Sequence, residues 1–336
     1  MLRKRSDKML KIVFMGTPDF ARVSLEKVYD AGHKIEAVVT NVDKSKGRGM
    51  KLVPSPVKQF AEEKGIKILQ PLKVKNNNLF IEEIKQLNPD VICVVAYGKI
   101  LPKELLDIPK LGCINVHGSL LPQYRGAAPI QWSVLNGDRK TGITTMYMDV
   151  GMDTGDMILK EETEIGDNET TGELWGRLSI LGGDLLVKTL KLIEEGKAPR
   201  EKQGEDFTTA PMLNKEMAKI DWETKKAEEI KNLVRGLNPI MGAYSYINGK
   251  KIKFWRVEVI SEKDLENEFP ELAEYGYKLK QIQAGTVLFS DVKKGLYIKA
   301  NGGIIKVLEI QGENARKMNV NEFLRGNSIG VGSMFE

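Results

Sequence analysis

The chain has 336 residues, of which 41% are hydrophobic and 29% charged, which is enough for at least one sizeable core and excludes disorder throughout. No apolar run reaches the roughly 20 residues that a membrane-spanning helix needs, and the basic tail at residues 1–8 is not followed by a signal-peptide apolar segment. We therefore expect a cytoplasmic protein. The formal net charge of +5 comes mostly from this tail, so bulk charge alone is weak support for a nucleic-acid partner.

Strands and helices alternate through the first third of the chain. Lys11–Met15 is typical of an apolar strand, Thr17 is suited to cap the next helix, and Pro18 suits its first position. The alternation continues with strands at residues 34–40, 66–69 and 91–96 and helices at residues 55–64 and 79–87. This order predicts a doubly wound, mostly parallel α/β sheet that binds ligands at the carboxyl ends of its strands. The first turn lacks a complete Gly-x-Gly-x-x-Gly series, so we predict no bound dinucleotide.

Two other features of this region bear on function. Lys44–Lys51 is basic and glycine-rich, which fits either a solvated loop or a mobile arm that meets phosphates. Cys93 and Cys113 both lie in apolar strand patterns, so we expect reduced thiols in the core and no metal site.

Polar side chains follow where a buried strand should end. Residues 112–118 have the pattern of a short strand, in which Asn115 and His117 point to the same side because side chains alternate. The chain has two histidines, and His33 has the surroundings of a turn residue, so His117 is the candidate for proton transfer near neutral pH. The alternative is that Asn115 and His117 only satisfy hydrogen bonds at a sheet edge.

Two neighbouring segments favour a site over a sheet-edge role. The loop that begins at Ser119 is apolar, with Pro and Gly at its bends, and could line a pocket for a flat cofactor ring. A strand-like run at residues 141–148 then leads to a turn whose glycines bring Asp149, Asp153 and Asp156 to the same rim. These carboxylates could also simply cap turns.

The pattern changes in the second half of the chain. Helical patterns cover residues 128–135 and 171–195, and a polar stretch with Gly and Pro at residues 195–204 predicts a domain boundary near residue 205. We therefore predict a catalytic domain at 9–205, a linker at 206–220 and a C-terminal domain at 221–336. The last contains a helix at 225–237 and short strands around an Asn248–Gly249 turn, which is typical of a small, partly open β barrel.

Basic and acidic segments of the C-terminal domain suggest how it would meet RNA. Residues 250–256 interleave bases with aromatic and aliphatic residues, which fits either a phosphate-tracking strand or an ordinary half-buried one. Residues 261–275 are acidic, so we expect them to face away from any bound RNA.

The motifs together resemble a known family. An Asn and a His two residues apart, then Ser-Leu-Leu-Pro, then an Asp about three dozen residues on is the site pattern of the formyltetrahydrofolate-dependent formyltransferases. Counted from His117, it selects Asp153 over Asp149 and Asp156. Two segments resemble the methionyl-tRNA branch: Met15–Ala21 and the loop Gly47–Gly49 leading into Pro54–Lys58.

The resemblance implies both a reaction and a site. It implies a Rossmann-like formyltransferase fold with an OB-like, tRNA-binding C-terminal domain, 10-formyltetrahydrofolate as co-substrate, initiator methionyl-tRNA as acceptor and no metal. A monomer is expected. Implied catalytic residues are Asn115, His117 and Asp153; folate-lining residues are Ser119, Leu120, Leu121 and Pro122; tRNA-binding residues are Arg48, Lys46 and Lys51.

Three alternatives stay open from the sequence. A formyltransferase for an amino sugar or a glycinamide nucleotide would share the site but would not need the Arg48 loop or the β-rich C-terminal region. A formyltetrahydrofolate hydrolase would use water in place of the amine. A non-catalytic RNA-binding protein would not require the Asn, His and Asp spacing.

Overall fold

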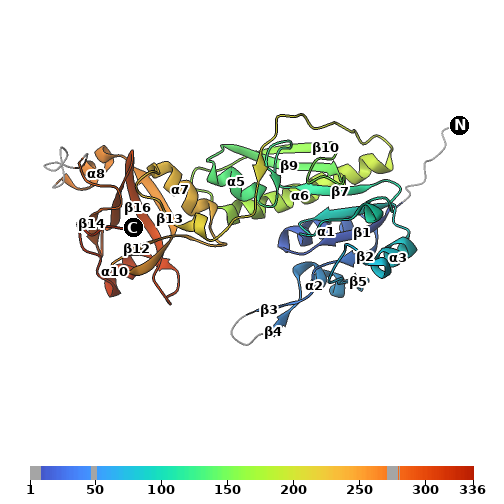
Figure 1. The fold of residues 1–336 in the computed structure, drawn as a ribbon, viewed down its shortest axis with the longest axis horizontal. Helices are drawn as coiled ribbons and strands as arrows, with labels where there is room; N and C mark the ends of the chain where they lie inside the picture. The colour runs from blue at the N-terminus through green and yellow to red at the C-terminus, as the bar shows by residue number, and fades with distance from the viewer. Residues whose placement is uncertain (1–8, 47–50, 271–278, 280) are drawn as a thin grey trace. The chain divides into compact units, whose positions relative to one another are not determined.

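A computed structural model describes residues 9–46, 51–270, 279 and 281–336, and the basic tail predicted at residues 1–8 lies outside the described residues (Figure 1). The chain divides into two compact units. The N-terminal unit contains residues up to Ile130, Lys140–Glu164 and Trp175–Pro211. The C-terminal unit contains Gln131–Arg139, Ile165–Leu174 and Met212–Glu336. Two short segments from the middle of the chain therefore fold with the C-terminal unit.

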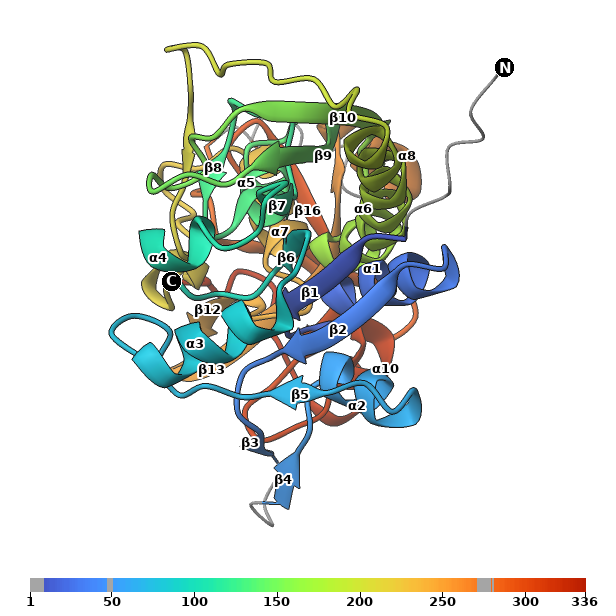
Figure 2. The same ribbon diagram turned by 90° about the vertical axis from the view of Figure 1, so that its right-hand side faces the viewer.

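The N-terminal unit is built on a seven-stranded sheet of order β10-β9-β7-β6-β1-β2-β5 (Figure 2). The strands from β5 to β7 are parallel, whereas β9 runs antiparallel to β7 and β10 antiparallel to β9. This confirms the doubly wound, mostly parallel α/β sheet. Its strands are β1 (Lys11–Gly16), β2 (Lys34–Val39), β5 (Ile68–Leu69), β6 (Val91–Val95), β7 (Cys113–His117), β9 (Lys140–Tyr147) and β10 (Met157–Glu164).

Helices cover both faces of this sheet, which is why its central strands are continuously apolar. Figure 2 shows α1, α2 and α6 on one side and α3 and α4 on the other. One face of β1, with Val13 and Met15, packs in a core that includes Ile84 of α3 and Leu105 of α4. The helices up to residue 200 are α1 (Asp19–Asp30), α2 (Pro56–Glu63), α3 (Asn78–Leu87), α4 (Lys103–Leu106), α5 (Pro129–Leu135) and α6 (Thr171–Glu194). Most of α5 and the start of α6 belong to the C-terminal unit.

The predicted start of α1 is wrong by one residue. Pro18, in an extended conformation, occupies the N-cap position, and the helix begins at Asp19 without a side-chain cap. The Thr17 hydroxyl instead accepts a hydrogen bond of 3.1 Å from the Asn41 amide, which follows β2. A long-range contact therefore uses the hydroxyl that the local pattern assigned to the helix.

Cys93 on β6 and Cys113 on β7 are buried free thiols, as predicted. Burial raises the pKa of Cys113 to about 12, so the thiolate is disfavoured at neutral pH. Within the described ranges, no group of three or more His, Cys, Asp or Glu residues is placed to hold a metal ion. Within the same ranges, no helix has the length and apolar character needed to cross a membrane.

The C-terminal unit is an antiparallel six-stranded sheet consistent with a small barrel. The strand order is β12-β13-β16-β15-β14, and β17 pairs with β16. The Asn248–Gly249 turn joins β12 to β13 with both residues at positive φ, as a tight hairpin requires. The elements are η1 (Glu216–Ala218), α7 (Ala227–Gly236), β12 (Ala243–Ile247), β13 (Lys250–Ile260), α8 (Glu262–Glu268), β14 (Val287–Asp291), β15 (Gly295–Ala300), β16 (Gly303–Gln311), β17 (Met318–Asn319) and α10 (Val320–Gly326).

The acidic segment after β13 forms α8, a helix that the sequence analysis did not predict. Glu262 lies 2.7 Å from the Lys299 ammonium, and Glu268 lies 3.2 Å from that of Lys306. Part of the acidic charge is therefore paired with lysines of the barrel itself.

Candidate active site

The end of β7 carries the two polar side chains that the strand period placed on one side. His117 is 5% exposed, whereas Asn115 is only half-buried. Strand β9 pairs with β7, so that His117 lies opposite Thr144. The strand thus holds a buried imidazole and an accessible amide at the same edge of the sheet.

The surroundings of the imidazole fix which of its nitrogens carries hydrogen. His117 Nε2 lies 2.9 Å from the Tyr124 carbonyl oxygen, which can only accept, so Nε2 carries the proton of this hydrogen bond. His117 Nδ1 lies 3.6 Å from Asp153 Oδ2. In the neutral ring the Nδ1 lone pair therefore lies beside a carboxylate, and a proton gained there would complete an ion pair.

The Asp153 carboxylate meets both β7 side chains. Oδ2 accepts a 2.8 Å hydrogen bond from the Gly126 backbone N–H, and Oδ1 lies 3.5 Å from the Asn115 amide nitrogen. The other two candidate carboxylates have different partners: Asp149 accepts from the Val150 N–H at 2.7 Å, and Asp156 lies 3.7 Å from the guanidinium of Arg200. The structure therefore brings together the three residues selected by spacing.

The loop after β7 is held from inside by hydrogen bonds. The Ser119 hydroxyl is fully buried and donates to the Gln123 carbonyl at 2.6 Å. The Thr144 hydroxyl, which the sequence analysis missed, donates to the Ser119 carbonyl at 2.7 Å and accepts from the Leu121 N–H at 3.0 Å.

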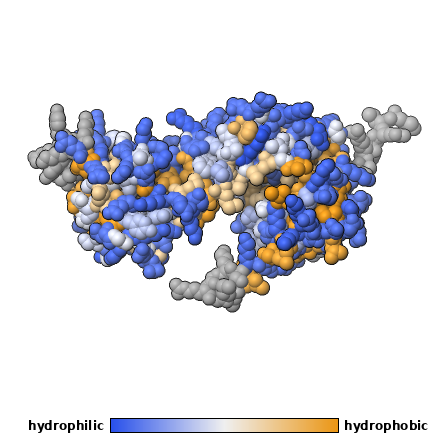
Figure 3. Space-filling model, viewed as in Figure 1, coloured by the Kyte–Doolittle hydropathy of each residue, from blue (hydrophilic) through white to orange (hydrophobic). Residues whose placement is uncertain are grey.

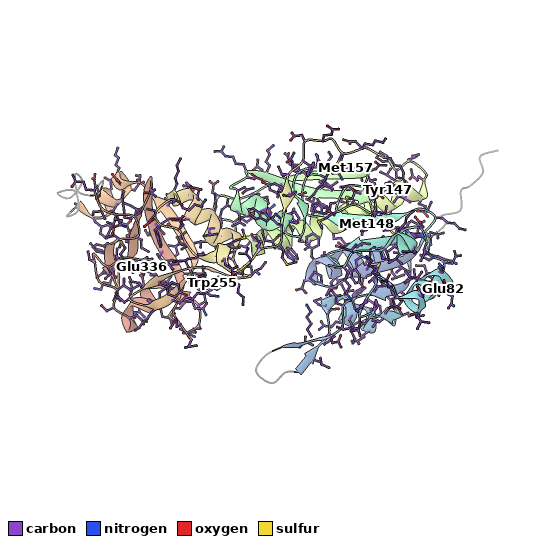
Figure 4. All side chains as sticks on the ribbon, viewed as in Figure 1. Glu82, Tyr147, Met148, Met157, Trp255 and Glu336 are labelled. Carbon is purple, nitrogen blue, oxygen red and sulfur yellow. The ribbon has the colours of Figure 1, made fainter. Side chains whose placement is uncertain are left out.

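The four predicted folate-lining residues differ in burial. Leu121 is 1% exposed and belongs to a small core with Met146 and Met157, the last of which is labelled in Figure 4. Leu120 and Pro122 are half-buried. Of these four residues, Leu120 and Pro122 therefore keep surface for a ligand, whereas Ser119 and Leu121 shape the loop.

The basic segment predicted to meet tRNA is part of a hairpin. Strands β3 (Lys44–Lys46) and β4 (Lys51–Val53) pair antiparallel, with Lys46 opposite Lys51. Arg48 lies outside the described residues, and the side chains of Lys46 and Lys51 are outside them as well. Their predicted contacts with tRNA remain predictions.

A charged cluster fixes the base of this hairpin. The Lys58 ammonium donates to Asp43 Oδ2 at 2.6 Å, and the Gln70 amide donates to Oδ1 at 2.8 Å. These hydrogen bonds, the one from Lys58 first, lower the pKa of the Asp43 carboxyl from its usual range. Asp43 directly precedes β3. Its two carboxylate oxygens are therefore held by Lys58 of α2 and by Gln70, which follows β5.

Replacing Lys58 by Met should raise the pKa of Asp43. Because the folded-state pKa is depressed, the pair stabilises the protein fully above the unfolded value of about 3.9, and this stabilisation is lost as pH falls through the folded value. We expect Lys58→Met to cost at most about 1 kcal/mol at pH 7 and to cost progressively less in acid. Urea unfolding across this range checks it, with Lys64→Met as the control, because the Lys64 ammonium lies over the Tyr29 ring. A loss independent of pH would contradict the prediction.

Comparison with protein-family models places the chain in a family. The sequence model of the formyl transferase family matches residues 10–190, and that of the formyl transferase C-terminal domain matches residues 212–328. The chain is therefore a member of the formyl transferase family.

Full-length relatives narrow the class. The chain is 48% identical over 328 residues to a methionyl-tRNA formyltransferase of Caldanaerobacter subterraneus subsp. tengcongensis, covering 97% of this chain and 100% of the relative. It is 50% identical over 325 residues to one from Clostridioides difficile, covering 96% and 99%. The chain belongs to the methionyl-tRNA formyltransferase family.

A solved structure with low sequence identity shares the fold. An N-formyltransferase of Helicobacter canadensis, in complex with folinic acid and dTDP-3-aminofucose, aligns with a TM-score of 0.63 at 20% identity. The alignment covers 90% of this chain and 100% of that one. At this identity the likeness concerns architecture.

Proposed function

We propose that the protein transfers the formyl group of 10-formyltetrahydrofolate to the amino group of methionine esterified to initiator tRNA. The observation that carries the proposal is the convergence of Asn115, His117 and Asp153 at the end of β7, in a chain whose close relatives are methionyl-tRNA formyltransferases. The product, formylated methionyl initiator tRNA, is used in translation initiation, so we expect the protein to act in the cytoplasm.

The reaction needs a place for negative charge and a route for one proton. When the neutral amine attacks the formyl carbon, its C=O bond opens and charge builds on the oxygen. The half-buried Asn115 amide supplies a donor to that oxygen, and His117, whose Nε2–H is bonded to the Tyr124 carbonyl, can donate from Nδ1 once that nitrogen has gained a proton. The amine then loses a proton, the bond from carbon to folate nitrogen breaks, and that nitrogen is protonated as tetrahydrofolate leaves.

Asp153 acts on this route through His117. At 3.6 Å from Nδ1 its carboxylate is too far for a direct hydrogen bond but close enough to stabilise a protonated imidazole. We therefore assign Asp153 to charging and orienting the ring, with a bridging water as the means of passing a proton between them. For the folate, Leu120 and Pro122 offer apolar contact, while Ser119 and Leu121 hold the loop that presents them.

Two surfaces are proposed to meet the tRNA. The first is the β3–β4 hairpin, with Arg48, Lys46 and Lys51. The second is the outer side of the β12–β13 hairpin, which would make the C-terminal domain predicted at residues 221–336 a tRNA-binding domain. In the view of Figure 3, hydrophilic residues cover most of the visible face of each unit.

The β12–β13 hairpin combines rings and positive charge. Tyr244 and Tyr246 alternate with buried residues of β12, and their ring centroids are 5.8 Å apart. Tyr246 lies opposite Lys251 in the strand register, and the Lys251 ammonium lies 3.4 Å from the centre of the Tyr244 ring. The lysines of β13 alternate with the buried Ile252 and Phe254, as in an ordinary half-buried strand. This alternation also leaves the outer side of the hairpin basic and aromatic.

Replacing Arg48 and Lys51 together by Ala should weaken the salt dependence of tRNA binding. Each lost phosphate contact lowers the slope of log affinity against log salt by about 1, so the double variant should lose about 2. Titrations with methionyl initiator tRNA at several salt concentrations measure the slope. The control is Lys64→Ala, because the ammonium of Lys64 lies over the Tyr29 ring. An unchanged slope would remove the hairpin from the tRNA interface.

Acceptor dependence tests the reaction itself. Tetrahydrofolate release is followed with methionyl initiator tRNA, with amino-sugar nucleotides, with glycinamide ribonucleotide and with buffer alone. The proposal expects release only with the tRNA. Release in buffer would identify a hydrolase, and release with another amine would move the protein to that acceptor.

A further inference from the structure

The polar stretch at residues 195–204, predicted from its composition to mark a domain boundary, continues into a segment that returns to the site within the N-terminal unit. Glu201 and Met157 exchange backbone hydrogen bonds of 2.8 and 2.9 Å. Farther on, the Thr208 hydroxyl accepts from the Tyr124 N–H at 2.9 Å, and β11 (Thr209–Ala210) pairs with β8 (Arg125–Gly126). We call residues 201–210 the strap.

Gln203 of the strap binds the backbone around Asp153. Its amide nitrogen donates to the Asp153 carbonyl at 2.7 Å and to the Gly155 carbonyl at 2.8 Å. Asp153 has φ +54°, in the left-handed region that non-glycine residues seldom adopt. Both hydrogens of one amide therefore hold a turn whose central residue is in a sparsely populated conformation.

The oxygen of the Gln203 amide contacts the loop that binds the Asp153 carboxylate. Gln203 Oε1 accepts a 2.8 Å hydrogen bond from Arg125 Nε. The next residue, Gly126, donates its N–H to Asp153 Oδ2. One side chain thus links the turn that carries Asp153 to the loop that binds its carboxylate.

Glutamine is well suited to this position. The amide orientation is set by its partners, because two carbonyls require a donor and a guanidinium requires an acceptor. Glutamate would keep the contact with Arg125 but would place a carboxylate oxygen against two carbonyl oxygens. Asparagine is one methylene shorter.

We propose that Gln203 is a positioning residue, which sets the Asp153 carboxylate against His117 and thereby supports the reaction without touching the substrates. The kinetic test of this inference rests on the proposed function, whereas the spectroscopic test does not. Misplacing a reacting group by as little as about 1 Å can cost a factor of about 100 in rate. Gln203 should therefore matter for kcat and little for substrate affinity.

The test compares wild type with Gln203→Ala, Gln203→Glu and the control Glu201→Ala. The control lies in the same strap, but its carboxylate is 65% exposed and 3.8 Å from its Lys160 partner. We expect both Gln203 variants to lose about 10- to 100-fold in kcat, with KM for tRNA and folate changed less than about threefold. Glu201→Ala should keep wild-type kinetics. Wild-type kcat in Gln203→Glu would overturn the proposed donor role, and equal rises in both KM values with kcat unchanged would overturn the positioning role.

A second readout needs no turnover. The chain has two histidines, so the ring ¹⁵N signals of His117 are assigned by comparison with His33→Ala. We expect these signals to move at neutral pH in Gln203→Ala and to stay in Glu201→Ala. Unmoved signals in a folded Gln203→Ala overturn the positioning role even if the acceptor proves not to be tRNA. If Gln203→Ala does not fold, Gln203→Met replaces it, and failure of both to fold assigns Gln203 to the fold alone and overturns the proposal.

Discussion

Replacing His117 by Ala should lower kcat for formyl transfer by about 10²- to 10³-fold, which corresponds to about 2.7–4 kcal/mol of transition-state stabilisation. The loss is expected because the variant removes the imidazole beside Asp153, which in the proposed reaction gains a proton at Nδ1 and then donates to the developing oxyanion. It also leaves the Tyr124 carbonyl without the 2.9 Å hydrogen bond from Nε2. Single-turnover measurements with saturating folate separate this loss from slow product release.

His33→Ala is the matched control for this experiment. His33 is the other histidine of the chain, and burial lowers its pKa from the ordinary value. We expect the control to keep its rate within about twofold, because His33 lies directly before β2, at the amino ends of the parallel strands, whereas His117 lies at the carboxyl end of β7. If folded His117→Ala also kept the wild-type rate of formyl transfer, the imidazole would have no part in catalysis.

Replacing Asp153 by Asn should lower kcat by about 10²-fold or more, in the range of contributions from acid–base groups. Asn keeps the size of the side chain and an oxygen that can accept from the Gly126 N–H, but it removes the negative charge 3.6 Å from His117 Nδ1. The imidazole then loses the carboxylate beside Nδ1. Steady-state kinetics should show a larger change in kcat than in KM.

Asp149→Asn controls for charge at the same rim. The Asp149 carboxylate accepts from the neighbouring Val150 N–H at 2.7 Å and lies on an exposed turn. Its variant should behave as wild type. If Asp149→Asn and Asp153→Asn had equal effects, general electrostatics of the rim, and not the pairing with His117, would explain the loss.

The main features of the site could be predicted because they depend on local patterns. A strand places alternate side chains on one side, so Asn115 and His117 had to lie together at the end of β7. Asn248–Gly249 predicted a hairpin for a similar reason, since a tight turn needs two residues that tolerate positive φ. Such inferences use only the conformational preferences of a few neighbouring residues.

Other features depended on contacts between distant segments. The Thr17 hydroxyl bonds to Asn41 and not to the first turn of α1, and the Ser119 hydroxyl donates to the Gln123 carbonyl of its own loop. Gln203 lies far along the chain from the residues that it binds, in a stretch whose polar composition is typical of a linker. No local pattern marks a polar residue as an active-site partner when the partner is brought near only by folding.

Formylated product on the tRNA is the most direct measurement of the central claim. Methionyl initiator tRNA is incubated with 10-formyltetrahydrofolate and either wild type or His117→Ala, the ester is hydrolysed, and the released amino acid is identified by mass. We predict N-formylmethionine with wild type and a yield lower by about 10²-fold or more at early times with the variant. Unmodified methionine with wild type, under conditions in which the folate is consumed, would contradict the assignment of the acceptor.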